Sequence, residues 1–400
     1  MKHNHPRKSR LFVLMILAAA LALAILAGFL FVFCRSAQKA PKGPVKKADP
    51  ITAQVKRMTT EEKVGQLFLV TPDQLTGARV TTAGEATRQA IAKTQPGGLI
   101  YFDDNLKNPA QTQALLKDTR QIYNDLGLPA PFLAVDEEGG EVARVAHNPA
   151  FGVQNVGDMR EIGRTGNPAK AAAAGTTIGT YLSGLGFNLD FAPDADVLTN
   201  PANRVVARRS FGTDPTLVKN MSAAEARALM ACGVIPCLKH FPGHGATAGD
   251  THAGAAATDK TLDELMQAEL VPFTDVNAYA PMIMAGHIAA PKVTGDNTPA
   301  CLSKKMVTDV LRGKLHYKGV VTTDSLQMGA VTQTTDSGQA AVAALQAGCD
   351  LLLMPKDFPA ARSAVLTAVQ NGTISETRLN ASVTRILKCK AKLNKTAKLK

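Results

Sequence analysis

Residues 234–244 read Val-Ile-Pro-Cys-Leu-Lys-His-Phe-Pro-Gly-His, an apolar stretch that ends in basic and imidazole side chains. Short apolar runs of this kind are typical of strands buried in a parallel sheet. An amphipathic stretch with helical spacing, Thr216–Ala231, comes directly before it. The segment therefore predicts one strand of an α/β unit, with polar groups placed where the strand ends.

The same alternation of a short apolar strand and a longer helical stretch recurs along the chain. Eight such repeats favour an α/β fold with a parallel sheet closed into a (β/α)8 TIM-type barrel, in a single domain. An open doubly wound sheet is the alternative, but it normally carries a glycine-rich phosphate loop after its first strand, and this sequence has none. The predicted strands are Gln66–Val70, Gly98–Phe102, Phe132–Val135, Phe187–Ala192, Val234–Lys239, Met282–Ala285, Gly319–Thr323 and Asp350–Met354. The predicted helices are Gln111–Leu126, Ala169–Leu185, Thr216–Ala231, Leu262–Asn277, Lys304–Leu315 and Gln339–Gln346.

Polar side chains follow five of these predicted strands. In a barrel the carboxyl ends of the strands form one face, and functional groups lie there. Any single one of these side chains could be a structural carboxylate or a core histidine, but five sets at one mouth predict a site. In chain order they are Asp136, Asp196, Lys239 with His240 and His244, His287, and Asp324.

The stretch 243–258 consists mainly of glycine and alanine and has no large apolar side chain, so we expect a mobile loop over the mouth. Asp250 and His252 lie two residues apart within it. A carboxylate can hold a histidine ring in one orientation and tune it as a general acid/base near neutral pH. The alternative is a solvated loop with two unrelated polar residues.

Five segments of the sequence resemble, in the same order, the signature blocks of the β-N-acetylglucosaminidases of glycoside hydrolase family 3. The resemblance extends from about Ile51 to Leu387 and is specific, because each block falls at a strand end or in the loop that follows. The segments are Val135–Arg144, Phe191–Asp196, Ala207–Gly212, Lys239–His252 and Thr323–Met328.

The resemblance implies a retaining exo-glycosidase that releases terminal β-linked N-acetylglucosamine. Asp324 would be the nucleophile, and the Asp250–His252 pair would be the general acid/base. Asp324 would attack the anomeric carbon while His252 protonates the leaving oxygen, and a second displacement at the same carbon would give overall retention. Asp136, Arg144, Arg209, Lys239 and His240 match the positions that hold the sugar hydroxyls, with Asp196 orienting Arg209 or Lys239. His244 and His287 would shape the pocket from behind.

The sequence departs from the family pattern in two ways. Ala246 occupies a position where many members carry an acidic residue, which leaves the tuning of the loop open. The second, sandwich domain of many members is missing, which favours the hexosaminidase branch over the β-glucosidase branch. The chain has no Trp and only five Tyr, so a small exo-acting pocket fits better than a long aromatic-lined cleft.

Three other functions were weighed. A metal-dependent hydrolase would need ligand spacing that Pro242 and its neighbouring glycines break, so we expect no metal and no cofactor. An inactive, anchored wall-binding protein would be expected to lack Asp324 or the Asp250–His252 pair. A phosphorylase stays open, because a histidine acid/base carries no negative charge and phosphate could replace water.

The two ends of the chain are strongly basic. Residues 1–48 hold nine Lys or Arg and residues 388–400 hold six Lys, with no acid in either, which leaves 30 basic and 33 acidic residues for 49–387 and a net charge of −3 there. The near-neutral domain gives no sign of a nucleic-acid partner. The basic ends are either solvated or in contact with an anionic surface.

Arg7, Lys8 and Arg10 precede an apolar run from Leu11 to Cys34, which is 24 residues long and sufficient to span a bilayer. We predict a basic cytoplasmic segment (1–10), a transmembrane anchor (11–34), a linker (35–48), the glycoside hydrolase domain (49–387) and a basic tail (388–400). The domain would lie outside the cell membrane. A cleaved signal peptide or a lipoprotein at Cys34 is the alternative. The expected substrate is a carbohydrate, either a peptidoglycan fragment, which the anchor and the basic ends favour, or a chitin-derived oligosaccharide.

Overall fold

The computed structural model describes residues 7–36, 49–247, 249–251 and 254–396. The chain divides into two units, Met1–Asp49 and Pro50–Lys400. The first contains the helix α1 (Arg7–Ser36). Within the described residues, its part Arg10–Val32 is the one helical segment that is long and apolar enough to cross a membrane, with a mean hydropathy of 2.8.

The second unit is built on eight parallel strands that follow one another around the sheet in chain order. A parallel bridge between Thr322 and Leu351 links the last two strands, which closes the sheet into a barrel. This confirms the predicted barrel, and all eight predicted strands are present, several of them shorter than expected. The strands are β1 (Phe68–Val70), β2 (Gly98–Ile100), β3 (Phe132–Val135), β6 (Leu189–Asp190), β7 (Ile235–Phe241), β9 (Met282–Ala285), β11 (Val320–Thr323) and β12 (Leu352–Leu353).

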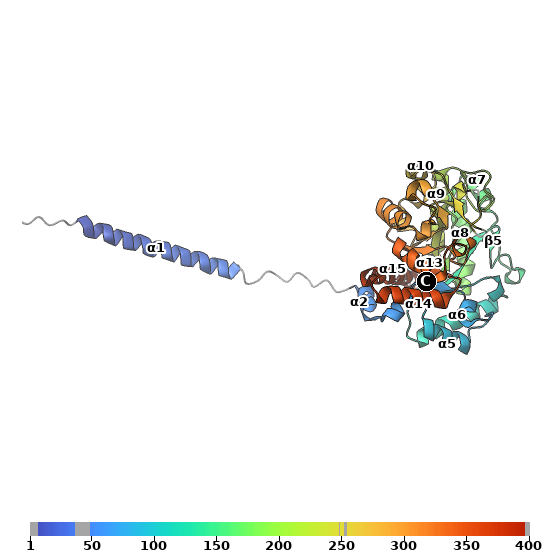
Figure 1. The fold of residues 1–400 in the computed structure, drawn as a ribbon, viewed down its shortest axis with the longest axis horizontal. Helices are drawn as coiled ribbons and strands as arrows, with labels where there is room; N and C mark the ends of the chain where they lie inside the picture. Colours follow the sequence, from blue (N-terminus) through green and yellow to red (C-terminus); the bar gives the residue numbers. More distant parts are fainter. Residues whose placement is uncertain (1–6, 37–48, 248, 252–253, 397–400) are drawn as a thin grey trace, which may run out of the picture. The chain divides into compact units, whose positions relative to one another are not determined.

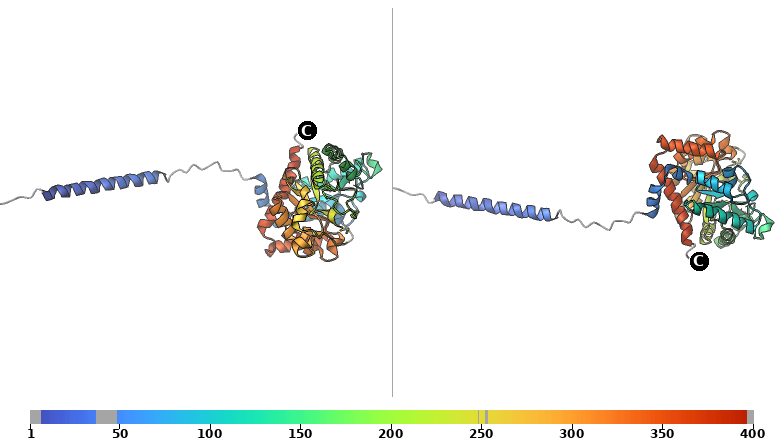
Figure 2. Two further views of the ribbon diagram at one scale, coloured as in Figure 1. Left: turned by 90° about the horizontal axis from the view of Figure 1, so that it is seen from above. Right: turned by 90° about the horizontal axis from the view of Figure 1, so that it is seen from below.

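Helices surround the strands (Figures 1 and 2). Many begin at a side chain that accepts a hydrogen bond from the first turn, as Asp214 does from the Leu217 amide at 2.6 Å. The helices of this unit are α2 (Pro50–Arg57), α3 (Thr60–Gly65), α4 (Pro72–Thr76), α5 (Glu85–Thr94), α6 (Pro109–Asp125), α7 (Met159–Arg164), α8 (Pro168–Leu185), α9 (Pro215–Ala231), α10 (Leu262–Gln267), α11 (Pro291–Thr294), α12 (Gly329–Thr332), α13 (Ser337–Ala347), α14 (Phe358–Gln370) and α15 (Glu376–Thr396).

Shorter elements connect these helices and strands. Two small sheets lie at the mouth of the barrel, β4 (Glu137–Gly139) paired with β5 (Val142–Ala143), and β8 (Ala256–Ala257) paired with β10 (Ile288–Ala289). A π-helix, η7 (Lys305–Lys314), covers the expected helix after Ser303. The 3-10 turns are η1 (Asp103–Asn105), η2 (Pro149–Phe151), η3 (His244–Ala246), η4 (Val271–Phe273), η5 (Val276–Ala278) and η6 (Ala300–Leu302).

Two sequence-based expectations were wrong. The stretch Leu262–Asn277 is not one helix, because α10 ends at Gln267 and only short turns follow around Pro272, which has no amide hydrogen to continue a helix. Residues 388–396 are not a tail but the end of α15. Cys389 and Lys390 are buried there, since the apolar face of the helix continues past residue 387. Figure 1 shows α15 beside α2, the first helix of this unit.

The barrel interior is apolar and closely filled. Every residue of β1, β2, β3 and β11 is buried. Because all eight strands are parallel, their carboxyl ends open on the same face, and the end of β7 and the segments that follow β3, β7 and β11 carry most of the polar residues picked out above. The fold therefore brings together side chains that are up to about 190 positions apart in the sequence.

Candidate active site

A cavity of about 470 Å³ opens at the carboxyl ends of the strands. Its walls combine charged side chains with apolar ones from β9, β12 and the segment after β11. Apolar surface with a few convergent polar groups is the usual composition of a small-molecule site. The charged and polar residues are Asp136, Glu138, Arg144, Arg209, Lys239, His240 and Asp324, and the apolar ones include Phe102, Met284, Met328, Leu353 and Met354.

One wall of the cavity is a network of ion pairs centred on Glu138. Its carboxylate accepts two hydrogen bonds from Arg209, each 2.8 Å long, and lies 2.6 Å from the Lys239 ammonium. Lys239 also contacts the Asp136 carboxylate at 3.0 Å. Glu138 is 1% exposed, whereas Asp136 is 18% exposed and so reaches the cavity. We name Asp136, Glu138, Arg209 and Lys239 the ion-pair wall.

The charges of the ion-pair wall reinforce one another. Burial alone would raise the pKa of Glu138, but the cations of Arg209 and Lys239 outweigh burial and hold that pKa well below its usual range. Burial would lower the pKa of Lys239, but the carboxylates of Glu138 and Asp136 raise it. Glu138, Lys239 and Arg209 are therefore ionised at neutral pH, and the wall presents fixed donors and acceptors to a polar ligand.

Behind this wall, Asp196 holds His240 in place. The two are joined by a 2.7 Å bond between His240 Nδ1 and Asp196 Oδ2, and Asp196 also accepts the His244 backbone amide at 2.5 Å. Asp196 is completely buried, and its carboxylate bonds to His240 and His244 rather than to Arg209 or Lys239, the partners that the resemblance suggested. Arg209 instead has Asp194 near it, with Nε at 3.6 Å from the carboxylate.

Asp324 lies directly after β11, on the opposite side of the cavity from the end of β3. Its Oδ1 accepts the Ser325 amide at 2.7 Å. Burial alone would raise its pKa, but the nearby His287 and His240 rings, the Ser325 amide and Lys239 together lower it. Asp324 is therefore an ionised carboxylate at neutral pH.

His287 is fixed behind Asp324 by two contacts. Its Nε2 lies 2.8 Å from the Ser325 carbonyl oxygen, and its Nδ1 lies 3.2 Å from the Cys301 sulfur. The carbonyl can only accept, so Nε2 carries a proton. This arrangement orients the segment that bears Asp324.

Arg144 is held at the cavity edge by the short β4–β5 hairpin. Its backbone amide donates to the Asp136 carbonyl at 3.4 Å, and its guanidinium lies 5.6 Å from the centre of the Phe102 ring. Gly139 and Gly140 form the turn of this hairpin with φ values of +89° and +56°, which other residues rarely adopt. The turn therefore aims Asp136, Glu138 and Arg144 at the same space.

The loop after β7 is clamped at both ends by Glu269, which is completely buried. Gly243 opens the loop with φ +130°, and a Cβ there would lie 2.6 Å from the Glu269 side chain. Lys260, just past the loop, pairs with the same Glu269 carboxylate. Between them, Asn203 donates to the His244 and Thr247 carbonyls, each at 2.9 Å.

The middle of this loop touches the segment that follows β11. The Ala330 amide of α12 donates to the Thr251 carbonyl at 3.2 Å. Asp250 is among the described residues, whereas the predicted acid/base His252 lies outside them. The loop is thus positioned over the side of the mouth that carries Asp324.

Comparison with known proteins identifies the family. The profile of the Glycosyl hydrolase family 3 N terminal domain matches residues 59–389. The chain belongs to glycoside hydrolase family 3. It is 33% identical over 380 residues to "Beta-hexosaminidase A" of Pseudoalteromonas piscicida, covering 86% of this chain and 62% of that protein. It is 34% identical over 284 residues to "Beta-hexosaminidase" of Pseudomonas aeruginosa, covering 71% of this chain and 82% of that protein.

Solved structures agree with the family assignment. A glycoside hydrolase family 3 β-N-acetylglucosaminidase from Paenibacillus sp. str. FPU-7 superimposes with a TM-score of 0.79 and 35% identity, over 84% of this chain and 63% of that one. The chain thus spans less than two thirds of the length of this protein and of the Pseudoalteromonas relative.

Sequence reasoning missed Glu138, the centre of the ion-pair wall. The signal was available, since residues two apart on a strand point to the same side, and Asp136 and Glu138 are two apart. Asp194 was missed for a different reason, because nothing local distinguishes it from Asp196. Only the course of the segment after β6 places Asp194 against Arg209 and Asp196 against His240.

Asp194, Asp196 and His240 are also the one set of potential metal ligands that lie within 4.8 Å of one another among the residues that the structure describes. His240 Nδ1 already bonds Asp196, and the Arg209 guanidinium lies beside Asp194. A metal ion would have to displace these partners and stand next to a fixed cation. We interpret the set as a support for His240, and the expectation of no metal or cofactor stays a prediction.

Proposed function

We propose that this family 3 member is a retaining exo-β-N-acetylglucosaminidase that uses Asp324 as its nucleophile. The observation that carries the proposal is an ionised carboxylate, Asp324, in the same cavity as the ion-pair wall. The names of the relatives, β-hexosaminidase and β-N-acetylglucosaminidase, support the same activity.

The reaction would proceed in two displacements at the anomeric carbon. Asp324 attacks that carbon, a carboxylate oxygen forms the new bond, and the bond to the leaving oxygen breaks. His252, oriented by Asp250, gives its proton to the leaving oxygen. In the second step the same imidazole takes a proton from water, the water oxygen bonds to the anomeric carbon, and the Asp324 ester bond breaks. The configuration at that carbon is retained.

The ion-pair wall would hold the terminal sugar during both steps. Asp136 presents acceptor oxygens at the cavity surface, suited to a pair of neighbouring hydroxyls. Arg144, Arg209, Lys239 and His240 supply donors around it. Because Glu138 orients Arg209 and Lys239, and Asp196 orients His240, before a ligand arrives, little reorganisation of these three side chains is needed when the sugar binds.

We further propose that α1 anchors the enzyme in the cell membrane with the barrel outside. The basic residues before the span favour that orientation. An enzyme in this place would meet peptidoglycan fragments, in which N-acetylglucosamine is β-linked to N-acetylmuramic acid. We therefore propose such fragments as its substrate.

The activity is tested by assaying the full chain, in detergent, on the p-nitrophenyl β-glycosides of N-acetylglucosamine and of glucose. We expect release from the first substrate only, and a loss of about 10³-fold or more in kcat for Asp324→Ala. The exposed Asp263→Asn serves as the control and should keep full activity. Preference for the glucoside, or an Asp324→Ala variant as active as the native chain, would overturn the proposal. A requirement for phosphate would identify a phosphorylase.

A further inference from the structure

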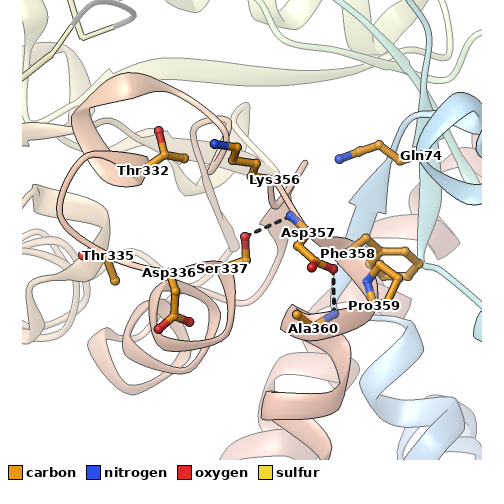
Figure 3. A pocket seen from close by; sticks show the side chains of 10 residues that line it. All are labelled: Gln74, Thr332, Thr335, Asp336, Ser337, Lys356, Asp357, Phe358, Pro359 and Ala360. Carbon is orange, nitrogen blue, oxygen red and sulfur yellow. Dashed lines mark hydrogen bonds between the residues drawn. The ribbon is translucent and has the colours of Figure 1, made fainter.

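A second cavity, of about 580 Å³, opens at the carboxyl ends of the strands (Figure 3). Three separate segments form it: Gln74 on α4, the connection from Thr332 to Ser337 between α12 and α13, and residues 356–360 at the start of α14. Phe358 is buried beneath it against Phe68, with ring centres 5.3 Å apart, so the floor is rigid.

The second cavity shares its supporting strands with the sugar cavity. Met354 lines the sugar cavity, and Lys356, two residues later, lines the second one. After the preceding strand, Met328 lines the sugar cavity and Thr332 lines the second cavity. Thr332 Oγ1 donates to the Met328 carbonyl at 3.3 Å. A ligand in the sugar cavity that extends toward α12 would therefore enter the second cavity.

The acid/base loop lies on the same side of the mouth. Ala330 of α12 donates to the carbonyl of Thr251, which stands between Asp250 and His252. A general acid must lie beside the oxygen that it protonates, so the leaving group has to pass next to this loop. The loop therefore contacts α12, and Thr332 of α12 lines the second cavity.

The second cavity is lined by two carboxylates, those of Asp336 and Asp357, and by one ammonium, that of Lys356. Asp336 and Asp357 cap α13 and α14 by accepting amides of their own first turns, at 2.9 Å in each case, and the helix N-termini offset their charge. Lys356 is exposed and extends over the cavity toward Thr332 (Figure 3). No hydrogen bond or ion pair to another described residue occupies its ammonium. It is the one cation among the described residues that line the second cavity.

The geometry points to a leaving-group subsite in the second cavity, in which Lys356 binds a carboxylate on the sugar or peptide that departs. The inference rests on the proposed function, because it takes its direction from the acid/base loop. It deepens that function by assigning a class of leaving group: one that carries a carboxylate, with hydroxyls or amides for Thr332, Thr335 and Ser337. The enzyme would thus prefer acidic over neutral disaccharides through a residue outside the sugar cavity.

The test compares two substrates that share the terminal sugar, N-acetylglucosaminyl-β-1,4-N-acetylmuramic acid and N,N′-diacetylchitobiose. For Lys356→Gln we expect kcat/KM on the acidic substrate to fall about 5- to 20-fold, the effect of one partly exposed charge-assisted hydrogen bond. Activity on chitobiose should stay within about twofold. Lys356→Glu should lower kcat/KM on the acidic substrate further. Lys356→Arg should restore most of the native ratio of kcat/KM between the acidic and the neutral substrate.

Lys117→Gln, an exposed lysine on the outer helix α6, is the matched control and should leave both substrates unchanged. If Lys356→Gln changed kcat/KM equally for the two substrates, or for neither, the proposed subsite would be overturned. Calorimetric binding of both disaccharides to Asp324→Ala, with and without Lys356→Gln, tests the subsite without turnover. Native chain that cleaves no N-acetylglucosaminide but still binds the acidic disaccharide through Lys356 would refute the proposed function and leave the subsite standing.

Discussion

The two ends of the barrel each bury a carboxylate among cations, but they use those cations differently. At the mouth, Glu138 holds Arg209 and Lys239, whose remaining donors face a cavity. At the opposite end, before β12, Asp350 is surrounded by three arginines and by the Ser382 hydroxyl at 2.6 Å. The arginines are Arg312 from η7 and Arg378 and Arg385 from α15.

Two of the arginines at the lower end direct other donors to the protein itself. Arg312 donates to the Gly319 and Gly348 carbonyls, and Arg378 donates to the Leu345 carbonyl. These bonds tie η7 and α15 to the end of α13 and to the residue before β11, and no residue of this cluster lines the sugar cavity. An ion cluster whose donors face a cavity can bind a ligand, whereas one whose donors bond to the protein stabilises the fold. In such barrels the carboxyl-terminal face carries the active site and the opposite face contributes to stability.

Removal of the charge at the mouth should have the largest effect, because it damages both properties. For Glu138→Gln we expect the free energy of unfolding to fall by about 3–5 kcal/mol, since two buried cations lose their partner. We also expect kcat/KM to fall about 100-fold, because Arg209 and Lys239 lose their fixed positions. Urea unfolding and turnover of the p-nitrophenyl N-acetylglucosaminide measure the two quantities.

The control for that variant is Glu141→Gln, a more exposed carboxylate on the same hairpin that lies 3.7 Å from Arg208. It should alter each quantity very little. If kcat/KM of Glu138→Gln stayed within threefold of the native value, the cations at the mouth would hold their positions without Glu138. The proposed difference between the two ends would then be wrong.

Removal of the charge at the lower end should affect stability alone. For Asp350→Asn we expect the free energy of unfolding to fall by about 3–5 kcal/mol. The kcat/KM of the folded fraction should stay within about twofold, because no donor of this cluster lines the sugar cavity. Circular dichroism suits the unfolding measurement because the chain has no Trp. A loss of activity in the folded fraction, with the exposed Asp309→Asn unchanged, would show that the two ends are coupled.

The smallest effect concerns Lys390, which is buried at the lower end of the barrel. Its ammonium donates to Gln66 Oε1 at 2.8 Å and lies 5.1 Å from the centre of the Phe132 ring. Burial lowers its pKa from 10.5 to about 7. Because the folded pKa is the lower one, this lysine destabilises the fold fully below pH 7, and the penalty fades as pH rises toward 10.5.

Lys390→Met should therefore raise the free energy of unfolding by about 1–3 kcal/mol at pH 6. The gain should shrink steadily between pH 7 and pH 10. Urea unfolding of both proteins across this range gives the difference directly, and Lys392→Met, an exposed neighbour, is the control. A gain that does not change with pH would assign the effect to packing rather than to charge.

Features of the molecule that depend on residues close together in the chain could be predicted from the sequence. The strands could be predicted because a buried parallel strand needs a continuous apolar run, and each run is visible in the sequence. The cavity residues Asp136, Lys239, His240 and Asp324 could be predicted because strand ends meet at one face. Glu138 was missed although its spacing from Asp136 was a signal, and Asp194 was missed because only the course of the segment after β6 places it against Arg209.

The end of the domain was placed too early for a similar reason. The lysines from Lys388 onward suggested a solvated tail, yet Lys390 and Cys389 are buried because α15 packs across the lower end of the barrel. A basic residue inside a core cannot be recognised from composition, which records charge and not surroundings.

The sequence by itself determined the barrel, the family and the face on which the polar residues gather, because hydrophobic periodicity and signature blocks are properties of neighbouring residues. Only the tertiary structure decided which charges pair. It showed that Asp196 supports His240, that Glu138 joins Arg209 to Lys239, and that a cavity with Lys356 lies beside the sugar cavity. Such pairings depend on distances of a few ångströms between segments far apart in the chain, and no local pattern specifies them.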